Sequence, residues 1–228
     1  MNDTEPLPEA SRPPAPAAAV VLSVLFHPLL IPTYGYILLA LTNPFLFGIN
    51  SLTDGRGRVL LLMVFLYTFV IPVLSVFIMV KLEMVDSLLI EDRMQRIGPL
   101  LLVMILYFWV FYNLHQNNDS PAIFNIFMLG VVMALAISFA INVVEKLSLH
   151  AVGMGGLVGM VMILLGVYGN LSVGLTGLDV GIVLVLAVLL AGAVGTARLA
   201  MSAHTTGQLV TGYLVGFTSQ WLALNFYF

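Results

Sequence analysis

Residues 121–144 read PAIFNIFMLGVVMALAISFAINVV, a stretch of 24 residues without a charged side chain. A membrane-spanning helix needs roughly 20 predominantly apolar residues, so this stretch is long enough to cross a bilayer. Six more stretches meet this requirement or nearly so: about 20–42, 59–80, 99–114, 151–170, 178–197 and 206–226. Together they fill most of the 228-residue chain. The sequence therefore predicts an all-α fold, a polytopic membrane helix bundle of about seven (six to seven) transmembrane helices.

The composition excludes an ordinary soluble domain. Hydrophobic residues make up 61% of the chain and charged residues 8%, whereas the apolar share of soluble domains is below about 50%. Residues 1–19 are rich in proline and predict a disordered N-terminal tail. They lack the cationic start of a cleavable signal peptide, so a single integral-membrane domain is expected over 20–228. We expect an integral membrane protein of the bacterial inner membrane.

Several functional classes are excluded by what the sequence lacks. It contains no cysteine, which excludes disulfides and thiolate chemistry. Its eight Lys and Arg residues form nothing like a basic nucleic-acid-binding surface. The expected partners are therefore the lipid bilayer and a membrane substrate, with no nucleic acid. The oligomeric state stays open.

Most of the basic and His residues are predicted to lie at one face of the membrane. If all seven stretches cross it, the loops at 81–98, 145–150 and 198–205 share one side. These loops hold six such residues: Arg93, Arg96, Lys146, His150, Arg198 and His204. His27 lies near the same side. Ionisable side chains at membrane depth are costly and usually mark a functional site, so this grouping predicts a site for an anionic group.

The spacing of these residues supports a more specific interpretation. Arg198 and His204 are six residues apart, Ser148 and His150 form a Ser-x-His pair, and Arg96 is followed by Pro99. Arg96 with Pro99, Ser148 with His150, and Arg198 with His204 resemble, respectively, the three motifs of the type 2 phosphatidic acid phosphatase superfamily, KxxxxxxRP, PSGH and SRxxxxxHxxxD. The resemblance covers roughly residues 80–215.

The chain also departs from these motifs. Leu89 stands in place of the first motif's Lys, and Leu147 and Leu149 replace the Pro and Gly of the second. In the third motif, Ala197 replaces the Ser and Gln208 replaces the Asp.

The resemblance implies a phosphohistidine mechanism. His204 would be the nucleophile, and His150 would protonate the leaving oxygen as a general acid. The phosphoryl oxygens would be held by the remaining polar residues of the motifs and their neighbours: Arg198, Arg96, Arg93, Lys146 and Ser148. Gln208, Glu145 and His27 would support these groups. The substrate would be a membrane lipid phosphate, such as a phosphatidate or a polyprenyl pyrophosphate, and neither a metal nor a cofactor is expected.

Gln208 leaves a second function open. An amide can orient the imidazole of His204 but cannot supply the negative charge that stabilises an imidazolium. If the protein is an enzyme, Glu145, Asp86 or Glu91 is expected near His204, or else Gln208→Asp should raise activity. The alternative is a non-catalytic phospholipid-binding or transport protein with the same fold.

Other polar or small residues have simpler explanations. A haem held by His150 and His204 would leave the neighbouring Arg residues unexplained. His115 is interpreted as an interfacial residue at the opposite face. Glycines at 153–159 and at 212 and 216 predict close helix packing rather than a nucleotide-binding loop.

Overall fold

The computed structural model describes residues 15–88, 90, 92–117, 120–168 and 179–228. Over these residues the secondary structure is helical, without β-strands. Six segments are long and apolar enough to cross a membrane, by their length and composition: Ala17–Thr42, Gly55–Lys81, Met94–Gln116, Ala122–Val144, Leu149–Val167 and Val180–Ala200. The predicted all-α membrane helix bundle is thereby confirmed.

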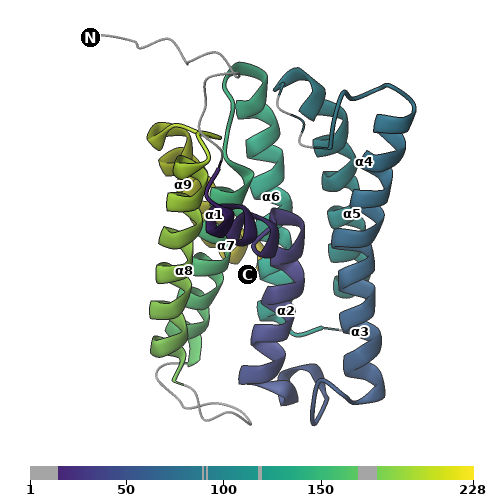
Figure 1. Cartoon of the computed structure of the whole chain (residues 1–228). Coiled ribbons are helices and arrows are strands. Elements are labelled where there is room, and N and C mark those ends of the chain that lie inside the picture. The colour runs from purple at the N-terminus through teal and green to yellow at the C-terminus, as the bar shows by residue number, and fades with distance from the viewer. Residues whose placement is uncertain (1–14, 89, 91, 118–119, 169–178) are drawn as a thin grey trace.

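The helices form two groups around a central pair (Figure 1). One outer group consists of α3 (Gly55–Phe65), α4 (Ile71–Lys81) and α5 (Ile97–Gln116). The central pair is α6 (Ala122–Val144) and α7 (Leu149–Tyr168). The other side holds α8 (Val180–Ala200) and α9 (Thr206–Tyr227), and both contact α7. The N-terminal helices α1 (Ala17–Leu25) and α2 (Ile31–Thr42) precede them in the chain.

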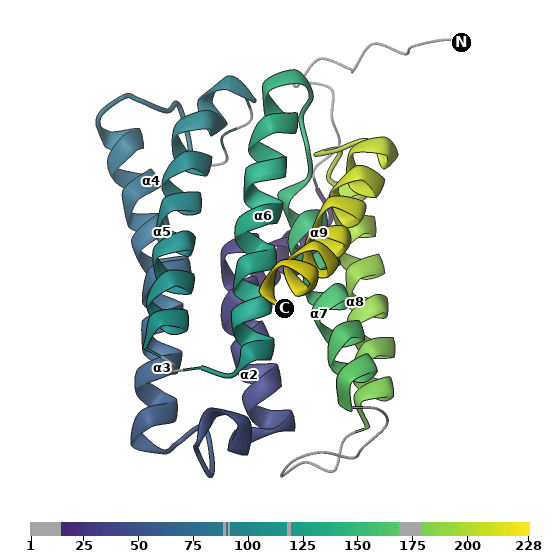
Figure 2. The ribbon, with the colours of Figure 1, turned by 180° about the vertical axis from the view of Figure 1, so that it is seen from behind.

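The predicted seventh helix, over 206–226, corresponds to α9 but is not among the six apolar segments. It crosses obliquely over the central helices, on the side that faces the viewer in Figure 2. Its last residue, Tyr227, has its hydroxyl 3.3 Å from Nδ1 of His115 at the end of α5, and 3.4 Å from the amide nitrogen of Asn125 near the start of α6. The helix therefore runs from one end of the bundle to the connection between α5 and α6.

Glycines bring α7 and α9 into close contact, as the sequence predicted. A Cβ added at Gly212 would lie 2.8 Å from the carbonyl oxygen of Ser148, and one added at Gly216 would overlap the carbonyl oxygen of Val152. Small residues at such positions allow the backbones of membrane helices to approach each other. This packing fixes the position of α9 along α7.

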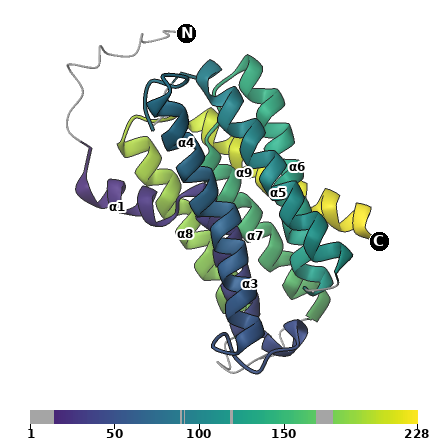
Figure 3. The same cartoon turned by 90° about the vertical axis from the view of Figure 1, so that its right-hand side faces the viewer.

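The predicted first helix, over 20–42, is broken at His27 and Pro28. Helix α1 lies across the bundle and α2 runs along it (Figure 3), with a short 3₁₀ turn, Pro28–Leu30, between them. Residues 17–19 form the start of α1, which corrects the predicted disordered tail at its C-terminal end. Residues 1–14 of that tail lie outside the described residues.

A second proline creates a local irregularity in the α3–α4 helix. Pro72 has no N–H, so the carbonyl of Thr68, four residues earlier, loses its helical donor. The backbone forms a π-helical turn over Leu66–Val70 at this point. The Tyr107 hydroxyl donates to the Thr68 oxygen over 2.8 Å, so a side chain from α5 satisfies the freed carbonyl.

The connections that follow α4, α6 and α8 all lie at the same end of the bundle (Figure 1). This agrees with the side predicted for the basic residues. The extended backbone after α6 turns inward along the bundle, so α7 begins below the end of α6. The first turn of α7, with His150, is thus carried into the interior.

Candidate functional site

A cavity of about 330 Å³ lies inside the bundle and brings together residues that are distant in the sequence. Its polar lining includes three His and two Arg, which define what we call the basic cavity: His27, Arg96, His150, Arg198 and His204. None of the described lining residues is Asp or Glu. Most of the other lining side chains are apolar and come from α4, α5, α6 and α7. The cavity therefore combines basic groups with an apolar remainder.

His150 is oriented by the helix break in α1. The N–H of His27 bonds to the carbonyl of Val24 instead of continuing the α-helical pattern, which leaves the Ser23 carbonyl without its usual donor. Nε2 of His150 lies 3.0 Å from that oxygen. Because a carbonyl oxygen only accepts, Nε2 carries the proton, and Nδ1 is the nitrogen that can act on a ligand.

Arg198 lies in the last turn of α8 and is anchored at one end of its guanidinium. One Nη donates to Oγ of Ser23 over 3.2 Å and approaches the sulfur of Met201 at 3.9 Å. Nε of Arg198 is buried and has no hydrogen-bond partner. A buried donor without a partner is costly, so Arg198 is able to bind a further acceptor, such as an anionic oxygen.

His204 is held by the N-terminus of α9. Its Nδ1 lies 3.0 Å from Oε1 of Gln208, and that oxygen also accepts the backbone N–H of Thr205 over 3.3 Å. The Thr205 side chain in turn accepts the N–H of Gln208, which completes a capping box. Because the Thr205 N–H requires an acceptor, it identifies the Gln208 oxygen, so the proton lies on Nδ1 of His204. The lone pair is then on Nε2.

The environment keeps His204 neutral. The pKa of His204 is lowered to about 4, chiefly by burial and in addition by the positive charges of Arg198, Lys146 and Arg96, while the hydrogen bond that His204 donates to Gln208 acts in the opposite direction. A neutral imidazole with an unprotonated Nε2 is the form required of a nucleophile or a general base.

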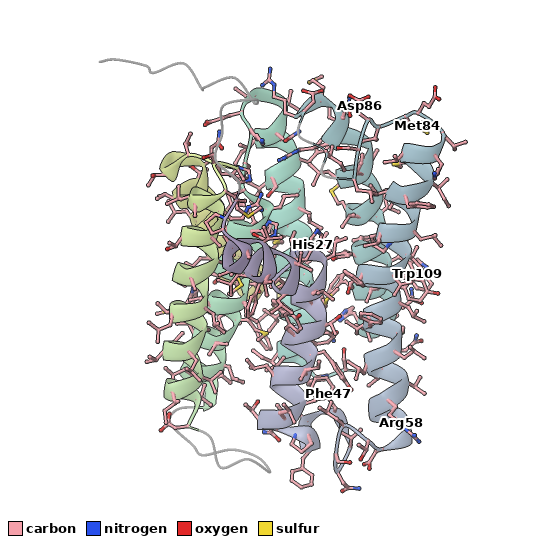
Figure 4. All side chains as sticks on the ribbon, in the orientation of Figure 1. His27, Phe47, Arg58, Met84, Asp86 and Trp109 are labelled. Carbon is pink, nitrogen blue, oxygen red and sulfur yellow. The ribbon has the colours of Figure 1, made fainter. Side chains whose placement is uncertain are left out.

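His27 and Arg96 complete the basic cavity. Nδ1 of His27 accepts the N–H of Leu29 over 3.3 Å, and its ring lies 5.7 Å from the His150 ring in an edge-to-face arrangement. Figure 4 shows His27 within the bundle, away from its ends. Arg96, at the start of α5, donates to the carbonyls of Ile90 and Leu147 over 2.8 and 3.4 Å. These carbonyls hold its guanidinium against the cavity wall.

Three of the predicted phosphate-binding residues do not line the cavity. Arg93 is exposed and donates to the carbonyls of Val143 and Val144, so it caps the C-terminus of α6. Ser148 is fully buried, and its Oγ lies 3.5 Å from the N–H of Ala151 at the start of α7. Lys146 is not among the lining residues, and its positive charge lowers the pKa of His204.

The predicted acidic partner of His204 is not found among the described residues. Glu145 is exposed and does not line the cavity. Asp86 lies at the end of the bundle (Figure 4), where the Gln95 amide donates to its carboxylate over 2.6 Å. Glu91 lies outside the described residues. Among the described residues, no group of three or more His, Cys, Asp or Glu is placed to hold a metal ion.

Sequence reasoning missed Ser23, Tyr107 and Gln220. Ser23 contacts both His150 and Arg198 but is a single serine in an apolar run, which gives no signal in the sequence. Tyr107 lines the cavity, but as one of several aromatic residues in its apolar run it gives no separate signal in the sequence. Gln220 could have been found, because an amide in the middle of an apolar helix is costly.

Comparison of the chain with known protein families, with curated proteins and with solved structures found no match.

Proposed function

We propose that the protein is a divergent integral-membrane lipid phosphate phosphatase that acts through a phosphohistidine on His204. The observation that carries the proposal is the basic cavity, in which five basic side chains converge without an acidic residue among its described lining. The positive charges of Arg96 and Arg198 repel each other, and a bound anion relieves that repulsion. A phosphoryl group offers enough oxygens to accept hydrogen bonds from several of the basic side chains at once.

The apolar part of the cavity supports an amphiphilic substrate. About 330 Å³ is at the lower end of the range for small-molecule sites, roughly 300–1,000 Å³. This volume accommodates a headgroup and the beginning of an apolar chain. The remainder of a long chain would lie in the bilayer.

The hydrogen bonds at the site are compatible with the two steps of the mechanism. Nε2 of His204 would attack phosphorus, forming an N–P bond as the P–O bond to the lipid breaks. Nδ1 of His150 would accept the proton of a monoprotonated lipid phosphate and pass it to the leaving alkoxide, and the Arg198 and Arg96 guanidinium groups would stabilise the charge on the equatorial oxygens. Water would then hydrolyse the phosphohistidine, with His150 accepting its proton.

Gln208 favours the second candidate, a non-catalytic phospholipid-binding or transport protein. The ring of His204 becomes positively charged when its Nε2 bonds to phosphorus, and it would then have an amide beside it instead of a carboxylate. Gln208 nevertheless fixes the tautomer of His204. In the serine-protease triad, changing the carboxylate to an amide lowers the rate by about 10⁴, mainly because the histidine is then held in the wrong tautomer.

Release of inorganic phosphate from a panel of lipid phosphates tests the proposal. The wild type should release phosphate, and His204→Ala should lose this activity because its nucleophile is gone. His115→Ala is the matched control, since His115 lies beside Tyr227 at the other end of the bundle and should leave activity unchanged. Activity that survives His204→Ala would refute the phosphohistidine. Binding of lipid phosphates without turnover by the wild type would favour the second candidate.

A further inference from the structure

One polar side chain of the cavity has no role in the proposed chemistry. Gln220, in α9, is fully buried and lines the same cavity as His150 and Arg198. Neither its amide nitrogen nor its amide oxygen has a hydrogen-bond partner. Burying an amide without partners is costly, because the hydrogen bonds that it makes with water are lost. Such a group in a ligand-sized cavity is therefore suited to pair with a ligand.

Glycines on two neighbouring helices make room for this amide. A Cβ added at Gly130 of α6 would lie 2.5 Å from both amide atoms of Gln220. A Cβ at Gly156 of α7 would lie 3.4 Å from its nitrogen, and one at Gly159 would lie 3.0 Å from its Cγ. The side chain of Gln220 is thus surrounded by helical backbone. The N–H and C=O groups of that backbone are already paired within the helices and do not bond the amide. Space is kept for the amide, while no side chain is supplied to bond it.

The position of Gln220 along the cavity follows from the packing of α7 and α9. Gly156, beside the amide, follows His150 by six residues, which corresponds to about 9 Å along the helix. Side chains from both levels project into the same cavity and shorten this gap. Along α9, Gln220 follows Gln208, which holds His204, by twelve residues or about 18 Å. A ligand with its phosphate on His204 would therefore extend along the cavity to bring its ester groups next to Gln220.

We infer that Gln220 is a hydrogen-bonding subsite that recognises an ester carbonyl or hydroxyl close to the phosphate of the bound lipid. The inference rests on the proposed function for the position of the phosphate. Its consequence is a substrate distinction: a diacyl lipid phosphate offers ester carbonyls to the amide, whereas a dialkyl ether analogue offers only the weaker ether oxygens and the hydrocarbon chain of a polyprenyl pyrophosphate offers no acceptor. A site that hydrogen-bonds its substrate rejects analogues lacking that group, because its own buried groups are then unpaired.

Binding of two matched lipids to the full-length protein in detergent tests this subsite. The probes are a short-chain diacyl phosphatidate and the dialkyl ether analogue with the same chain length, with inorganic phosphate as a reference. The wild type should bind the ester about tenfold more tightly than the ether, corresponding to one buried hydrogen bond. In Gln220→Met, which keeps an unbranched side chain of similar size, this preference should disappear while affinity for inorganic phosphate is unchanged.

Ser219→Ala provides the matched control. Ser219 is the neighbouring residue on α9, also fully buried and without a hydrogen-bond partner, but it does not line the cavity. This variant should keep the preference for the ester. The melting temperature of Gln220→Met without ligand should equal or exceed that of the wild type, because the lost amide had no partner to leave unpaired.

Four results are distinguishable. Loss of the ester preference in Gln220→Met but not in Ser219→Ala supports the subsite. This holds even when the wild type binds the ester lipid without releasing phosphate, a result that would overturn only the phosphatase. Equal affinity of the wild type for both lipids would overturn the subsite and leave the phosphatase standing, provided phosphate release depends on His204. A preference that persists in Gln220→Met would do the same. Failure of both lipids and inorganic phosphate to bind would overturn both proposals.

Discussion

Replacing Gln208 with Glu should raise kcat by about tenfold. The Gln208 amide oxygen lies 3.0 Å from Nδ1 of His204 and also accepts the Thr205 N–H. Glu has the same length and is equally suited to the third position of a capping box, so both bonds are kept. Asp is shorter by one methylene, so it would not reach the same position even though it matches the family motif.

The size of the effect follows from the geometry. A neutral hydrogen bond contributes about 0.5–1.5 kcal/mol and a charged one about 1.5–3 kcal/mol. The difference, about 1–1.5 kcal/mol, applies only after His204 becomes positively charged, and it corresponds to roughly a tenfold change in rate. The gain should be far below the factor of about 10⁴ for the triad, because Gln208 already fixes the tautomer. A carboxylate beside Arg198 should also weaken phosphate binding, so KM should rise.

The assay is steady-state phosphate release by the wild type, Gln208→Glu and Gln208→Met in the same lipid and detergent. The Met variant keeps the length of the side chain but has no oxygen acceptor, so its kcat should fall below that of the wild type. A Glu variant that is folded but has an unchanged or lower kcat would refute the role assigned to position 208.

Three further predictions concern stability and are measured by unfolding in detergent. Tyr107→Phe should destabilise the protein by about 1–3 kcal/mol, because it leaves the buried Thr68 carbonyl without its donor. The control, Tyr112→Phe at an exposed position, should change stability by less than about 0.5 kcal/mol. Equal effects of the two variants would contradict the hydrogen bond from Tyr107 to Thr68. Gly216→Ala should destabilise the protein by about 1–3 kcal/mol, because the added Cβ overlaps the backbone of α7. Gly192→Ala, with open space around the added Cβ, should stabilise it by about 0.5–1 kcal/mol. No change in stability for Gly216→Ala would contradict the close approach of α7 and α9. The pKa of His204 is lowered from 6.5 to about 4, chiefly by burial, so the unfolded state takes up a proton first as the pH falls. The free energy of unfolding should therefore be unaffected by this group above about pH 6.5 and decrease from there towards pH 4. A His204→Gln variant with the same pH profile would contradict this.

The helices could be predicted from the sequence because the length of each apolar run matches the length of helix that is needed to cross a bilayer. Residues 121–144 correspond to α6 within one residue at its start. The grouping of His150, Arg198 and His204 was also predictable, since helix parity places their loops at one end and ionisable groups in apolar surroundings are rare. The break in α1 was indicated by Pro28, but the direction of α1 across the bundle was not.

The details of the site depend on tertiary contacts that leave no pattern in the sequence. Arg93 and Arg96 have the same chemistry and are three residues apart, yet one caps α6 and the other lines the cavity. Which of them faces the cavity is decided by the packing of the turn before α5 against α6 and the segment that follows it. Ser23 was likewise invisible, because its carbonyl becomes available only where the helix stops.

The grouping of basic residues without a described acid in the cavity links folding to the composition of the buffer. An anion that binds the folded state but not the unfolded state adds RT ln(1 + [L]/Kd) to the free energy of unfolding, about 2.7 kcal/mol when its concentration is 100 times Kd. The bundle should therefore melt at a higher temperature in phosphate or sulfate than in chloride of equal ionic strength. Its measured stability is then a property of the protein together with its anion, and purification without such an anion should yield a less stable protein from the same sequence.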